Sequence, residues 1–165
     1  MRFFTYRRWL SFQRPAGRSG RADSANASYQ KHFESIRQLV PPSVSLLTDS
    51  ETLHDATVVN FELDTAASAL SMKLRGWDPQ FRNARLFTLS YENVRTVSIT
   101  AAADSPLPGP PGFGNLGYYE FDVHSPGVFK HCMLFSTGIE LAVCFSRFAY
   151  KASRTGIKRR KVRLP

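Results

Sequence analysis

The chain has 165 residues, of which 42% are hydrophobic and 13% aromatic, a composition typical of a folded globular domain and not of a disordered or membrane-spanning chain. Its formal net charge is +9, from 22 Lys and Arg against 13 Asp and Glu. Two cysteines, Cys132 and Cys144, are too few for a disulfide scaffold or a zinc site of four cysteines, so we expect free thiols and a cytoplasmic protein.

The positive charge is concentrated at the two ends. Residues 1–21 hold six Arg and residues 151–165 hold seven Lys or Arg, and neither segment has an acidic residue. Residues 22–150 hold nine basic and thirteen acidic residues, a net charge of −4, so the body of the chain lacks the basic excess of a nucleic-acid binder. We expect a disordered basic tail over 151–165. Any nucleic-acid binding would use the tails, with Lys158, Arg159, Arg160 and Lys161 as the densest run.

The start of the chain is rich in Arg and lacks acidic residues, which also suits a mitochondrial transit peptide, but its apolar side chains do not fall on one helical stripe, so a docked segment is preferred. The Arg-rich start is not followed by the apolar run of a secretory signal, and no stretch of 18 apolar residues occurs in the chain. We therefore expect no membrane association and a docked segment over residues 1–14. Residues 15–25 are rich in Gly, Ser and Ala, so a flexible connection is expected there.

A helix is predicted next. Apolar side chains recur close to the helical period at Tyr29, Phe33, Ile36 and Val40, and polar side chains occupy the other positions. Asp23 or Ser24 can cap its start, and Pro41 and Pro42 end it.

The period then changes to two, which indicates strands. Val59, Phe61 and Leu63 alternate with polar residues, and six further strands are predicted over residues 69–75, 86–91, 95–100, 118–124, 129–135 and 139–148. Because no helical pattern separates these strands, they favour an antiparallel meander. The sequence thus predicts an α+β fold, with an N-terminal amphipathic helix packed on a meander of about six or seven strands, in a single domain over 26–150.

The last hairpin can be placed in register. If residues 136–138 form a three-residue loop with Gly138 in the left-handed conformation, one core face carries His131, Met133, Phe135, Ile139, Leu141 and Val143. Cys132 and Cys144 then lie diagonally on the other face at roughly 7 Å, too far apart for an undistorted disulfide. His131 is expected to be a neutral core histidine that is held by one hydrogen bond.

The loop over residues 104–117 contains a formal G-x-G-x-x-G at Gly112, Gly114 and Gly117. A dinucleotide site needs this string between a strand and a helix, whereas here it opens a strand, so we expect no cofactor. The loop is either a surface excursion with its own shape or a partner-binding loop. Its candidate contact residues are Leu107, Phe113, Asn115 and Leu116.

Candidate chemistry is confined to histidines and nearby carboxylates, since the sequence has none of the common hydrolase, Walker or metalloprotease motifs. One alternative is a small metal-dependent hydrolase that uses His54, Asp55 and His131, which requires the three to converge in one cleft. A second is a weak cation site from Glu120, Asp122 and His124, which alternate on one strand. The simpler expectation is that His54 and Asp55 bind turn backbone and that the three polar residues are solvated.

Four short segments carry a resemblance to a known family: the opening MRFFT, LHDA at 53–56, GYYEF at 117–121 and HCMLFSTGIEL at 131–141. Together they resemble a family of small bacterial proteins that forms a domain of unknown function and is distantly similar to immunity proteins of bacterial toxin loci. The resemblance covers residues 1–14 and 25–150 and implies no activity. The Arg-rich start and the basic residues after Tyr150 depart from it.

The function expected from these observations is a non-catalytic protein-interaction module, with an immunity-type role as one form of it. Its partner would be another protein. The alternatives are the hydrolase and a nucleic-acid binder that acts through its tails. The sequence leaves the oligomeric state open.

Overall fold

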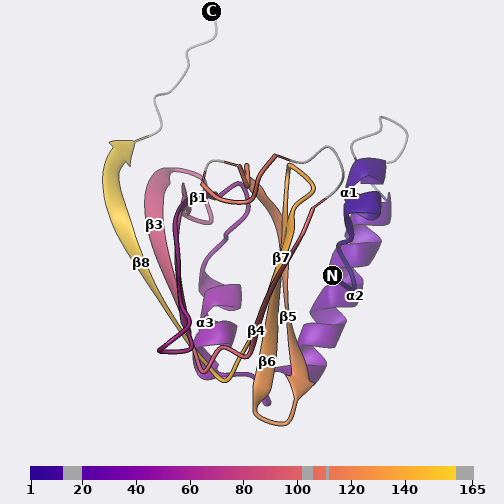
Figure 1. Cartoon of the computed structure of the whole chain (residues 1–165). Helices are drawn as coiled ribbons and strands as arrows, with labels where there is room; N and C mark the ends of the chain where they lie inside the picture. The colour runs from indigo at the N-terminus through magenta and orange to yellow at the C-terminus, as the bar shows by residue number, and fades with distance from the viewer. Residues whose placement is uncertain (13–19, 102–105, 111, 159–165) are drawn as a thin grey trace, which may run out of the picture.

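A computed structural model describes residues 1–12, 20–101, 106–110 and 112–158. This part of the chain contains three helices, α1 (Tyr6–Phe12), α2 (Gly20–Ile36) and α3 (Pro42–Ser50). Eight strands form two antiparallel sheets (Figure 1). The first sheet has the order β1 (Thr57–Asp64), β2 (Ala69–Trp77), β3 (Asn83–Glu92) and β8 (Arg147–Lys158). The second has the order β4 (Thr96–Thr100), β7 (Glu140–Phe145), β6 (Val128–Phe135) and β5 (Leu116–Ser125).

The α+β class is confirmed, but the single meander is wrong. The chain leaves the first sheet between β3 and β4, where Asn93 has a positive φ of 52°, and returns to it at Ser146, between β7 and β8. The two corners are joined, because the Ser146 N–H donates to the Glu92 carbonyl and the Arg95 N–H donates to the Cys144 carbonyl. The segment predicted as one strand over 139–148 is therefore divided between both sheets.

The core lies between the inner faces of the two sheets. The Tyr91 ring of β3 contacts Phe145 of β7 at 5.2 Å, and Phe148 of β8 contacts Phe121 of β5 at 5.5 Å. All four side chains are buried. These contacts place β8 opposite β5 and β3 opposite β7, so that the edge strands β1 and β4 lie on the same side of the sandwich.

Two helices close other sides of this core. In α2, Tyr29, Phe33 and Ile36 are buried, and the Tyr29 hydroxyl accepts the Phe121 N–H of β5 at 2.8 Å. Figure 1 shows α2 along the outside of the second sheet. In α3, Val44 and Leu47 are buried, and the Ser43 hydroxyl donates to the Phe148 carbonyl of β8.

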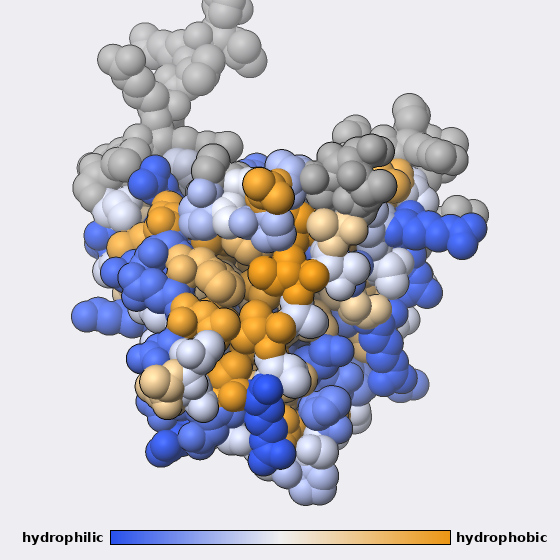
Figure 2. Space-filling model, in the orientation of Figure 1, coloured by the Kyte–Doolittle hydropathy of each residue, from blue (hydrophilic) through white to orange (hydrophobic). Residues whose placement is uncertain are grey.

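A β-bulge changes which side chains of β1 point toward the core. A β-bulge between Val58 and Asn60 turns Val59 out to solvent, so the inward set is Val58, Phe61 and Leu63 and not the predicted Val59, Phe61 and Leu63. Figure 2 shows hydrophobic residues gathered near the middle of this face, between the positions of β1 and β4 in Figure 1.

Two segments that were expected to be irregular carry secondary structure. Residues 20–25 of the expected connection belong to α2, and residues 151–158 of the expected basic tail belong to β8. The basic composition suggested a tail, but these residues pair with β3, as Ala152 does with Phe87 and Lys151 with Thr88. Residues 15–19 and 159–165 lie outside the described ranges.

The last hairpin is confirmed in register and in turn type. His131 pairs with Val143 and Met133 with Leu141, and Gly138 has a φ of 83°. The six predicted core residues of this hairpin are all buried. A Cβ at Gly138 would also lie 2.8 Å from the Tyr6 ring, so both conformation and space require glycine. Cys132 and Cys144 are free thiols, as predicted.

The first four residues are held by a buried carboxylate. Glu120, which exposes 5% of its surface, accepts backbone N–H groups from Arg2 at 2.8 Å and from Phe3 and Phe4 at 2.6 Å. The N-terminal ammonium lies 3.2 Å from Glu140. A charged acceptor with three donors is a stable way to bury a carboxylate.

We expect Glu120→Gln to destabilise the protein by about 1–3 kcal/mol, because the amide group points two donors of its own at backbone N–H groups. Equilibrium unfolding in urea measures the change, and hydrogen exchange should accelerate at the amides of residues 2–4. Glu62→Gln is the control, since Glu62 is exposed and its one side-chain contact is with Asn60. Equal stability of the two variants would contradict the role of Glu120.

Candidate functional site

A cavity of about 370 Å³ lies where α2, α3 and β5 meet. Four segments that are distant in sequence line it. Its lining residues are Phe4, Asn26, Tyr29, Gln30, Thr48, His54, Gly117, Tyr118 and Tyr119. We call it the His54 pocket, after the imidazole among these lining residues.

His54 is fixed by the backbone of β5. Leu53 before it is fully buried, and Asp55 after it has a φ of 61°, so the chain turns sharply at this point. The His54 Nδ1 lies 2.7 Å from the Gly117 carbonyl oxygen. A carbonyl only accepts, so Nδ1 carries the proton, and in the neutral ring Nε2 is left as an acceptor. The Asp55 N–H donates to the Leu116 carbonyl, which ties the same turn to β5 a second time.

Aromatic rings form the walls of the pocket. Phe4 and Tyr118 stack with centroids 4.5 Å apart and an interplanar angle of 4°, and Phe4 also contacts Tyr29 edge to face. Burial raises the pKa of the Tyr29 hydroxyl well above its usual value, and it raises the pKa of Tyr119 to about 12. Both phenols therefore stay neutral at physiological pH.

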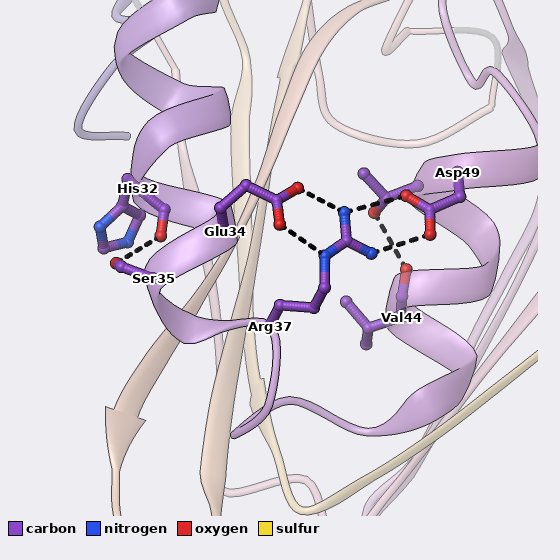
Figure 3. A network of polar contacts seen from close by, with 7 residues as sticks. His32, Glu34, Ser35, Arg37, Val44 and Asp49 are labelled. Carbon is purple, nitrogen blue, oxygen red and sulfur yellow. Dashed lines mark hydrogen bonds and ion pairs between the residues drawn. The ribbon is translucent and has the colours of Figure 1, made fainter.

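Arg37 sets the relative position of the two helices that line the pocket. Just after α2, its guanidinium binds Glu34 of α2 at 2.6 and 2.9 Å and Asp49 of α3 at 2.8 and 3.1 Å (Figure 3). The hydrogen bonds from Arg37 lower the pKa of Glu34, and those to Glu34 and Asp49 raise the pKa of Arg37. The ion pairs are exposed and contribute little stability, but their geometry joins the end of α2 to α3 beside the pocket.

The structure does not bring the three candidate catalytic residues together. His131 is fully buried on the inner face of β6, with its ring 3.9 Å from Phe121 and its Nδ1 2.8 Å from the Tyr91 hydroxyl. The side chains of His54 and Asp55 are about half exposed, and the His54 Nε2 lies 3.8 Å from the Asp55 Oδ1. His131 is thus the core histidine that was predicted, and burial lowers its pKa to about 3.

The three residues of the weak cation site, Glu120, Asp122 and His124, do not form a common site either. Glu120 is occupied by backbone N–H groups, Asp122 accepts from the His32 Nε2 at 3.0 Å, and His124 is exposed. Contrary to the expectation of three solvated side chains, Glu120 is buried. Across residues 1–12, 20–101, 106–110 and 112–158, no three His, Cys, Asp or Glu side chains are placed to hold a metal ion.

Two of the four candidate residues of the partner loop are buried, and two are exposed. Leu107 is 88% exposed and Asn115 is exposed, whereas Phe113 and Leu116 are buried and cannot offer surface to a partner. Phe113 packs on Phe135 at 4.7 Å, so the loop covers one end of the sandwich. For these two residues the partner-binding interpretation is wrong, because their apolar side chains complete the core.

The basic run reaches the end of the described chain. Lys158 is the last residue of β8 and pairs with Asn83 of β3. Arg159, Arg160 and Lys161 lie outside the described residues.

Sequence reasoning missed most of the pocket. Asn26, Gln30 and Thr48 lie on the polar sides of helices, where such residues are normally solvated. A usable signal was present only in the segments LHDA and GYYEF, which meet through the hydrogen bond between His54 and Gly117.

The stability of the protein should fall as the pH drops from 6.5 toward 3. His131 takes up a proton at its ordinary pKa of 6.5 in the unfolded chain but only at about 3 in the native state, so unfolding binds a proton within this window. The expected slope from this group approaches about 1.4 kcal/mol per pH unit. Urea unfolding of wild type and of His131→Gln, which keeps a partner for Tyr91, measures the difference.

The matched control for this titration is His124→Gln, because His124 is exposed. It should follow the wild-type pH profile, whereas His131→Gln should have a flatter one. Parallel profiles for wild type and His131→Gln would show that His131 is not the group that titrates.

No family model matches this chain, and neither does any curated protein. None of the helices in the described ranges is both long and apolar enough to cross a membrane.

Proposed function

We propose that the chain is a non-catalytic protein-interaction module of immunity type, and that the His54 pocket takes a side chain of its protein partner. The observation that supports this most directly is the chemistry of the lining. Aromatic walls from Phe4 and Tyr118 meet neutral hydrogen-bonding groups of Asn26, Gln30 and Thr48. Pockets of this kind hold the anchor residues that dominate protein interfaces.

The size of the pocket favours a side chain over a cofactor. Its volume of about 370 Å³ is near the lower end of the range of roughly 300–1,000 Å³ that is usual for small-molecule sites. Among the described residues, the lining has no Lys or Arg, which the phosphates of a nucleotide cofactor would need.

The polar groups specify which side chain fits. In the neutral ring, the His54 Nε2 accepts a hydrogen bond, and the amides of Asn26 and Gln30 can both donate and accept. A flat ring with one N–H or O–H donor would pack against the aromatic walls and donate to His54. Trp and Tyr have this combination and are enriched at interface centres.

The hydrolase alternative has less support. Acid–base hydrolysis needs at least two positioned groups beside the reacting bond, and of the residues that this alternative requires only His54 lines the pocket. His131, the third residue that this alternative required, is enclosed between the sheets.

The proposal is tested by a substitution that fills the His54 pocket with a large side chain. Asn26 and Ala27 are adjacent exposed residues of α2, and only Asn26 lines the cavity. We expect Asn26→Trp to weaken binding of a partner protein by at least about tenfold and Ala27→Trp to leave it unchanged, with similar melting temperatures for both. The probes are the purified products of the genes that flank this one, with affinity measured by calorimetry.

Growth assays test the immunity role separately. If a flanking gene encodes a toxin, co-expression of wild type or Ala27→Trp should protect the cells, whereas Asn26→Trp should not. Equal protection by both Trp variants would contradict the pocket. A rise in wild-type melting temperature with divalent metal that is lost in His54→Ala would instead favour the hydrolase.

A further inference from the structure

The edge strands β1 and β4 lie on the same side of the sandwich, and several of their inward-pointing side chains are partly exposed. On β1 these are Phe61 and Leu63, and on β4 they are Val97 and Ile99, which pair with buried residues of β2 and β7. Leu63 is 44% exposed and Ile99 is 40% exposed. Figure 2 shows apolar surface in this region. We call these four residues the uncovered side.

The two edges differ in how they are protected. The β1 edge has a bulge after Val58, and it carries Glu62 and Asp64 on its outer face. Bulges and charges are the usual devices that prevent an edge strand from pairing with another chain. The β4 edge has neither, because Thr96–Thr100 contains no charge and no proline and pairs with β7 without a register shift.

The other two edges are engaged by their own chain. At β5, the backbone of Leu116 bonds with the backbone of Asp55 and Ala56, and the Tyr29 hydroxyl accepts the Phe121 N–H. At β8, the Ser43 hydroxyl donates to the Phe148 carbonyl, and charged side chains follow along the strand. Among the described strands, β4 is therefore the edge best suited to pair with another strand.

The sequence of β4 is complementary to itself. In an antiparallel pair centred on Ser98, Ser98 would face its own copy, Val97 would face Ile99, and Thr96 would face Thr100. All the apolar pairs then fall on the inner face and all the hydroxyl pairs on the outer face. Such cross-strand pairs of β-branched residues and of threonines stabilise a sheet.

We infer that the chain forms a two-fold symmetric homodimer in which the β4 strands of two copies pair antiparallel about Ser98. The second sheet becomes an eight-stranded sheet across the dimer, since each copy contributes four strands. The two-fold axis of such a pair is perpendicular to the sheet, so both inner faces lie on the same side of it. The uncovered sides of the two copies then face each other, which removes Leu63 and Ile99 from water.

The dimer is tested by placing a charged side chain at Ser98, which lies on the proposed two-fold axis. Ser98 is exposed on the outer face, so Ser98→Lys and Ser98→Glu should both fold and should both be monomeric, because like charges would meet across the axis. An equimolar mixture of the two variants should associate again as a heterodimer. Sedimentation velocity at about 100 µM measures the mass, a concentration at which a dimer with Kd of about 10 µM is mostly associated.

The control is Ala149→Glu, an exposed position on the outer face of the edge strand β8, which should remain dimeric. A monomeric wild type, or a dimeric Ser98→Lys, would overturn the inference. As a second measurement, Ser98→Cys should form an intermolecular disulfide on mild oxidation far faster than Ala149→Cys, and equal rates would also overturn it. Neither result bears on the His54 pocket, whose test uses different variants.

Discussion

The fold depends on the two corners at which the chain leaves one sheet for the other. The Ser146 N–H bonds to Glu92, and the Arg95 N–H bonds to Cys144, so the corner after β3 and the corner after β7 support each other. Without them, β3, β4, β7 and β8 could continue as one flat sheet with an apolar face in water. With them, the two inner faces meet, and the core that contains Tyr91, Phe121 and His131 is closed.

Local patterns in the sequence were enough to predict most of the strands and one hairpin. A period of two located the strands, and the three-residue loop that ends at Gly138 set the register of the last hairpin, in which Met133 pairs with Leu141 and both are buried. The division into two sheets could not be seen, since residues 139–148 are mostly apolar and Ser146 is a weak turn signal. The bulge in β1 and the basic strand β8 were missed for a related reason: both depend on pairing partners that are distant in sequence.

One wall of the His54 pocket depends on the buried carboxylate of Glu120. Phe4 forms one wall, and its backbone N–H is held by Glu120, whose carboxylate sits on the outer face of β5. On the inner face of this sheet, His131 is also a buried polar group, and it is kept neutral instead of being paired with a charge. The difference arises from the donors available: the first residues bring three backbone N–H groups to Glu120, whereas His131 has one hydroxyl beside it. No property of residues 53–56 alone could have indicated this wall.

The pocket and the β4 edge lie at opposite edges of the second sheet, whose strand order is β4, β7, β6 and β5. Three strand spacings of about 4.8 Å separate β4 from β5, and the pocket lies beyond β5 against α2 and α3. A partner held at His54 would therefore not compete with a second copy paired at Ser98. In the proposed dimer, the two-fold axis places the two pockets at the far ends of one continuous sheet. A partner that is itself dimeric could engage both, and its second contact would form at the high effective concentration set by the first. Pairing through β4 would thus strengthen the proposed interaction without adding a contact to either pocket.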